Sequence, residues 1–84
     1  MSRPDLRDVY DDGLALADRL QKAGHEAAST DIRDAILGGA TSGEITMALN
    51  WHLRRLAREP SLDRETRTAV RRLRRQLKRT LLIL

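Results

Sequence analysis

Apolar residues recur every three or four positions along most of the chain, and no stretch alternates apolar and polar residues as a strand would. A first helix is expected over residues 4–23, because Ser2 can cap its first turn and Gly24 can end it in the left-handed conformation. The apolar face of this helix would consist of Leu6, Val9, Tyr10, Gly13, Leu16, Ala17 and Leu20.

Two further helices are expected in the middle of the chain. The first of them is short: Ser29 or Thr30 can cap it, and Gly38 ends it. The next one opens at Thr41, which has the capping-box spacing to Glu44, and a proline stops it. Their apolar stripes would consist of Ile32, Ala35, Ile36 and Leu37, and of Ile45, Ala48, Leu49, His52, Leu53 and Leu56.

A last helix is expected after Ser61, which can cap it. The pattern predicts a single all-α domain over residues 1–84, a small antiparallel bundle of four helices with a short second helix. The third and fourth helices would form a hairpin, and the first would turn its aspartates toward the arginines of the fourth. The stripe of the fourth helix would consist of Leu62, Ala69, Val70, Leu73, Leu77, Leu81 and Leu84.

Composition narrows the class of function. The 84 residues include no Cys, which excludes disulfides and thiolate metal sites, and no apolar run is long enough to span a bilayer. We therefore expect a cytoplasmic protein. The two histidines, His25 and His52, have no partner at metal-ligand spacing, and the H-E-x-x-H motif is absent. We expect no enzyme activity, no catalytic residue, no metal and no cofactor.

Charge is unevenly spread along the chain. Residues 1–49 hold five basic and nine acidic side chains, whereas residues 50–84 hold eleven basic and three acidic ones. Such a basic segment indicates contact with phosphates or with an acidic protein, but it equally fits a solvated face, or one paired with the acidic half of the chain. The candidate partner- or phosphate-binding cations are Arg71, Arg72, Arg74, Arg75, Lys78 and Arg79.

Large apolar residues suggest a second kind of contact. Met47 and Trp51 lie four apart on one side of the third helix, where we expect them in the core; if exposed, they would anchor a protein interface. The chain ends in four apolar residues that cannot all face one stripe, so either the single chain wraps around some of them or a partner subunit covers them. The candidate apolar contact residues are Met47, Trp51, Leu77, Leu81, Leu82 and Leu84.

Two hypotheses follow. The leading one is a small protein-binding regulator, adaptor or antitoxin-like module that forms a homodimer through apolar faces and selects an acidic partner by charge. The alternative is a DNA- or RNA-binding regulator that uses the last helix as a phosphate clamp. A helix-turn-helix reading of the two middle helices is weak, because the front of the second carries no Arg or Lys. Attachment to a membrane surface is a third, less favoured reading, and no small-molecule substrate is inferred.

Overall fold

The chain folds into four α-helices. The computed structural model describes residues 6–83, apart from the side chains of residues 82 and 83, and contains no strand in that range. The all-helical class predicted from the sequence is confirmed. The helices are α1 (Leu6–Lys22), α2 (Glu26–Leu37), α3 (Ser42–Leu56) and α4 (Arg64–Ile83).

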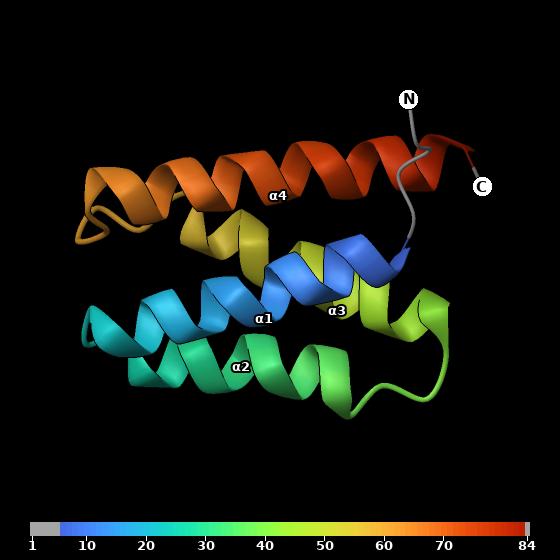
Figure 1. The fold of residues 1–84 in the computed structure, drawn as a ribbon, viewed down its shortest axis with the longest axis horizontal. Coiled ribbons are helices and arrows are strands. Elements are labelled where there is room, and N and C mark those ends of the chain that lie inside the picture. The colour runs from blue at the N-terminus through green and yellow to red at the C-terminus, as the bar shows by residue number, and fades with distance from the viewer. Residues whose placement is uncertain (1–5, 84) are drawn as a thin grey trace.

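Each helix packs against two others. α1 contacts α2 and α4, and α3 contacts the same two helices from the other side. Figure 1 shows successive helices running in opposite directions, with α1 between α2 and α4 in the view and α3 passing behind α1. These contacts are consistent with an antiparallel bundle, and the molecule measures 33 × 27 × 18 Å.

The end of α1 follows the sequence signal closely. Gly24 has a φ of +89°, a conformation that only glycine adopts without strain. Its N–H donates to the carbonyl of Gln21 (3.1 Å), and the N–H of His25 donates to the carbonyl of Leu20 (2.8 Å). This pair of bonds is a Schellman motif, which satisfies two of the last carbonyls of the helix. The expected cap at Ser2 lies outside the described residues.

The start of α2 was wrongly placed by the capping pattern. The helix begins at Glu26, immediately after the turn, and His25 occupies the N-cap position without a side-chain cap. Ser29 is buried, and its hydroxyl donates to the carbonyl of Ala17 on α1 at 2.7 Å. A hydroxyl that resembled a helix cap in sequence is instead a hydrogen-bond donor between two helices.

The start of α3 confirms the capping box. The N–H of Glu44 donates to the hydroxyl oxygen of Thr41 at 3.1 Å. The Glu44 carboxylate reaches back and accepts from the N–H of Ala40 at 3.2 Å, one residue before the cap. One free N–H group of the helix, and the N–H of the residue before the cap, are thereby bound by side chains within the same turn.

The start of α4 is set by Asp63 and not by Ser61, which corrects the sequence-based expectation. The Asp63 carboxylate accepts from the N–H of Thr66 at 3.3 Å, whereas the Ser61 hydroxyl donates to Glu59 at 2.7 Å. The Arg67 guanidinium then donates to the carbonyls of Glu59 (3.1 Å) and of Leu62 (3.3 Å) in the α3–α4 connection. The connection is therefore held by one side chain of α4 and by a side-chain hydrogen bond within it.

The core draws on all four helices. Its buried apolar side chains match most of the stripes that the sequence predicted, which explains why the chain folds without disulfides. Leu37 is the exception at the end of α2, because it is 72% exposed. No helix in the described part of the chain is both long and apolar enough to cross a membrane. The core consists of Val9, Leu16, Ala17, Leu20, Ile32, Ile36, Leu49, Leu53, Leu56, Leu62, Val70, Leu73 and Leu77.

Candidate binding surface on α3 and α4

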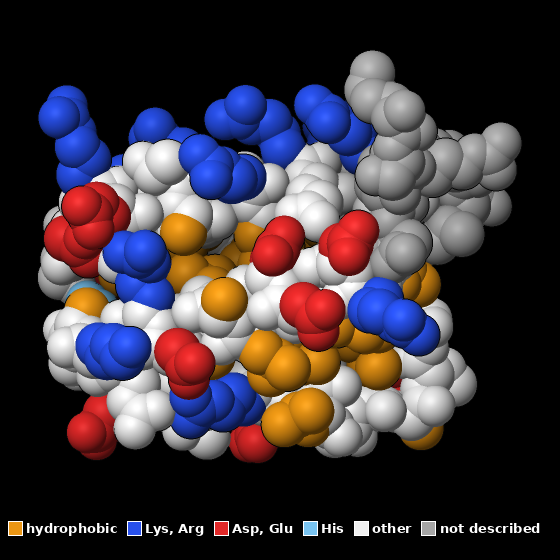
Figure 2. All heavy atoms as spheres, viewed as in Figure 1, with side chains coloured by type: hydrophobic (Ala, Val, Ile, Leu, Met, Phe, Trp, Pro, Cys, Tyr) orange, Lys and Arg blue, Asp and Glu red, His pale blue; other side chains and the backbone are white. Residues whose placement is uncertain are grey.

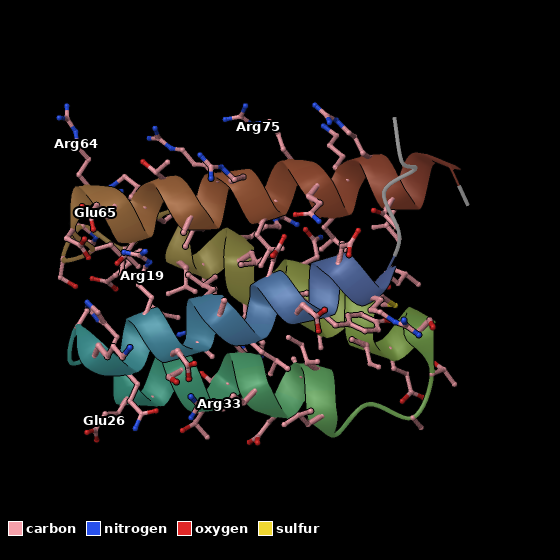
Figure 3. All side chains as sticks on the ribbon, viewed as in Figure 1. Arg19, Glu26, Arg33, Arg64, Glu65 and Arg75 are labelled. Carbon is pink, nitrogen blue, oxygen red and sulfur yellow. The ribbon has the colours of Figure 1, made fainter. Side chains whose placement is uncertain are left out.

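The basic helix α4 has a narrow buried edge. Its buried residues follow a four–three–four–three spacing, which leaves two flanks and an outer surface for the arginines. In Figure 3, Arg64 and Arg75 point away from the bundle. The cations of α4 thus reach solvent in more than one direction. One flank of α4 borders α3 and the other borders α1. The buried edge consists of Thr66, Val70, Leu73, Leu77 and Thr80.

The flank that faces α3 forms a groove with a purely basic charged lining. The groove has a volume of about 490 Å³, and its walls carry five cations and no carboxylate. Like charges gathered in one groove, with no carboxylate in its lining, attract anions. We call this surface the basic groove; its residues are Asn50, Arg54, Arg71, Arg74, Arg75, Lys78 and Leu81.

The flank that faces α1 is of mixed charge. Arg72 lines a shallow hollow together with Asp12 and Arg19, and Arg19 pairs with Glu65 at 3.2 Å. Figure 3 shows the latter two side chains pointing toward each other from α1 and α4. We expected aspartates of α1 to meet arginines of α4, but in this ion pair the arginine comes from α1. Figure 2 shows acidic side chains along α1 beneath the basic ones of α4.

The six cations predicted as one set are therefore divided. Four of them lie in the basic groove. Arg72 lies on the mixed flank, and Arg79 is exposed without lining either surface. Sequence reasoning missed Arg54 and Asn50, which α3 contributes to the groove. Their spacing of four places both on one side of α3, but only the packing shows that this side faces α4.

The apolar candidates also differ in position. Met47 is 76% exposed and Trp51 is 55% exposed, so the expectation that they lie in the core is wrong. The core arc of α3 is filled by leucines, and these two side chains lie on its outer side. Leu77 is 1% exposed and belongs to the core, which removes it from the surface of the single chain. Leu81 is 44% exposed at one end of the basic groove. Neither the side chain of Leu82 nor Leu84 is among the described residues.

Trp51 is held in place by its neighbours on α3. The Arg55 guanidinium lies 4.9 Å from the centre of the Trp51 ring, within the range of a cation–π contact. The His52 ring approaches it edge-on at 5.0 Å between centroids. These two contacts favour one orientation of an exposed aromatic side chain.

Both histidines line one cleft of about 340 Å³ between α2, α3 and the α3–α4 connection. Hydrogen bonds from the Ser61 hydroxyl and backbone lower the pKa of Glu59 in this cleft, and His25 lowers it further. Within residues 6–83, no three side chains of the metal-ligating types come together. Thr46, at the front of α3, is buried and donates to the Ser42 carbonyl at 2.8 Å, so it offers nothing to a base edge.

Comparisons with known proteins assign the chain to no family. No family model matches the chain, and neither a curated protein nor a solved structure matches it.

Proposed function

We propose that the protein is a non-enzymatic, cytoplasmic binding module whose basic groove contacts the phosphate backbone of DNA or RNA. The observation that carries this proposal is the segregation of charge: five cations line one groove, and no carboxylate lines it. A solvated polar surface would interleave both signs, as the flank facing α1 does. The basic groove instead presents uncompensated positive charge along one side of the bundle.

The chemistry of the cations fits phosphate. Four of the five are arginines, whose planar guanidinium groups stay charged and can bind phosphate oxygens through two parallel hydrogen bonds. Residues 71–78 cover about 10 Å of α4 at 1.5 Å per residue, so their side chains can contact several phosphates of one strand. Each contact releases condensed counterions, which is the main source of affinity for nucleic-acid backbones.

The proposed binding is independent of base sequence. The proposed contacts of the groove's cations are with phosphates, which carry no sequence information, and Asn50 is the one uncharged polar side chain of its lining. Acidic side chains lie along α1 on the face that Figure 2 shows, and none lines the basic groove; they would repel phosphate and so favour the orientation with the groove toward the nucleic acid.

The second candidate partner is an acidic protein segment, which the exposed Leu81 at the end of the basic groove favours. An apolar side chain in the groove would contribute to binding a protein and not to binding a phosphate backbone. Both partners would bring negative charges to the same cations of the basic groove. Substitution of these cations therefore tests both candidates, and nucleic acid is the first probe.

The test compares two variants of equal net charge. The groove variant carries Arg71→Gln, Arg74→Gln and Lys78→Gln, and the control variant carries Arg7→Gln, Lys22→Gln and Arg64→Gln. Each set removes three exposed cations from a chain of net charge +4. Affinity for a random-sequence duplex and for a random single strand is measured by fluorescence anisotropy at about 0.1 M salt.

We expect the groove variant to lose roughly two to three orders of magnitude in affinity at about 0.1 M salt, because each phosphate contact contributes close to one decade there. The control variant should change by only a few-fold, since its cations lie outside the groove. Equal losses in the two variants would show that general basicity and not the groove binds nucleic acid. Undetectable binding of the unaltered protein at low salt would reject the proposal and leave the acidic protein as partner.

A further inference from the structure

The outer side of α3 carries four exposed residues in a row. Glu44, Met47, Trp51 and Arg54 are spaced by three, four and three positions, which is the spacing of a helix–helix contact line in a coiled coil. Their character changes in order along the helix: an acid, two large apolar side chains, and a base. We call these four residues the α3 stripe.

We propose that the α3 stripe docks against the α3 stripe of a second copy of this chain, with the two helices antiparallel. In that register Met47 of each copy lies opposite Trp51 of the other, and Glu44 of each lies opposite Arg54 of the other. The stripe is therefore complementary to itself, because apolar residues meet apolar residues and acids meet bases, as a two-fold symmetric interface requires. Each contact is made twice by the symmetry.

Charge selects this arrangement over its alternative. A parallel pairing would place Glu44 against Glu44 and Arg54 against Arg54, and like charges at such contacts are destabilising. In the antiparallel pairing the two Arg54 residues are separated by ten residues along the helix axis, or about 15 Å. That distance exceeds the Debye length of about 8–10 Å at physiological salt, so their repulsion is largely screened.

The apolar centre of the stripe supplies the attraction. Met47 is 76% exposed and Trp51 is 55% exposed, and both would lose most of their contact with water in the pair. Trp51 needs little reorganisation, because Arg55 and His52 already hold its ring. One helix face on each side makes a small interface, so we expect a weak dimer with a dissociation constant on the order of micromolar or higher.

The pairing also determines where the two basic grooves lie. Asn50 and Arg54 lie toward the basic groove, whereas His52 and Arg55 line the cleft on the other flank of α3. A two-fold axis perpendicular to both helices keeps each flank on its own side of the pair. Both basic grooves therefore open on the same face of the dimer. This last step rests on the proposed function: because Arg54 of each copy pairs with Glu44 of the other, the four α4 cations of each groove remain for phosphate, and the dimer offers eight of them to one nucleic-acid molecule where the single chain offers five.

The experiment measures the solution mass by analytical ultracentrifugation over a wide range of protein concentration, without nucleic acid. We expect the mass to rise from the 9.5 kDa of one chain toward twice that value. Met47→Glu should keep the chain monomeric. Leu37→Glu is the matched control, because Leu37 is 72% exposed on another surface and its substitution should leave the association unchanged.

A charge-swap series tests the register. Glu44→Arg alone and Arg54→Glu alone each place like charges against each other and should weaken association about tenfold or more, whereas the double variant should restore it. Glu44 also accepts a hydrogen bond from the N–H of Ala40. The Glu44→Arg variant and the double variant both lose that bond, so stronger association of the double variant than of Glu44→Arg reports on the pairing.

Three results would overturn this proposal: a single-chain mass at every concentration, equal effects of Met47→Glu and Leu37→Glu, or no restoration in the double variant. Because no nucleic acid is present, failure of the dimer leaves the proposed function intact. Failure of nucleic-acid binding likewise leaves the dimer measurement unaffected.

Discussion

Replacing Tyr10 with Phe should stabilise the fold. The Tyr10 hydroxyl oxygen is buried and has no hydrogen-bond partner among the residues that the structure describes. Such a group costs about 1–3 kcal/mol, while Phe fills the same space and has a similar helix propensity. At the lower end, a gain of about 1 kcal/mol raises the Tm of a domain of this size by about 4–8 °C.

The matched control for this prediction is Ser29→Ala. It also removes a buried hydroxyl, but one that donates to the Ala17 carbonyl at 2.7 Å. Losing that bond costs about 1 kcal/mol, of which the better helix propensity of Ala returns about 0.5 kcal/mol. Thermal unfolding followed by far-UV circular dichroism should therefore show Tm rising for Tyr10→Phe and falling slightly for Ser29→Ala. A fall in Tm for Tyr10→Phe, or shifts of the same sign, would refute the reasoning.

Three further predictions concern the turns, the core and the acid range. Gly24→Ala should destabilise the fold by roughly 1–2 kcal/mol through its φ of +89° alone, since no atom lies within 4 Å of the added Cβ; urea unfolding measures this. Leu53→Ala should cost about 2–5 kcal/mol in the same assay, because the side chain is fully buried. Hydrogen bonding by Thr66, whose N–H donates to the carboxylate, lowers the pKa of Asp63 from 3.8, so the contribution of Asp63 to stability is complete above that pH and is lost as the pH falls through the folded-state pKa. Asp63→Ala should accordingly show a smaller drop in Tm between neutral and acid pH than the unaltered chain.

The sequence was sufficient where a structure depends on atoms only a few residues apart. The turn at Gly24 and the capping box at Thr41 are of this kind, because each is closed by hydrogen bonds within one turn of helix. The apolar stripes were also predictable, since burial of one helical face imposes its own period. These local rules specify four helices and most of the core.

The sequence failed where two local solutions compete. Ser29 and Ser61 both have the residue type and position of a helix cap, yet their hydroxyls bond to Ala17 and to Glu59. Asp63 lies two residues after Ser61 and caps α4 with a charged carboxylate, which also interacts favourably with the helix dipole. The choice between such candidates depends on where the neighbouring helix comes to lie.

The candidate surface depends on packing between helices, and so the sequence could identify only part of it. The cationic run of α4 was visible, but its division between a basic flank and a mixed flank follows from which helix borders each side. Met47 and Trp51 were expected in the core because large apolar residues are most often buried. The leucines of α3 already fill the available core space, which leaves these two outside.

The most direct test of the central claim is the salt dependence of binding to random duplex DNA, measured at protein concentrations where the chain is monomeric. Five cations in the basic groove, each worth about 0.9 in slope, give an expected value of about −4.5 for log K against log salt concentration. A slope near zero, or no binding at low salt, would contradict the claim that the groove contacts phosphates.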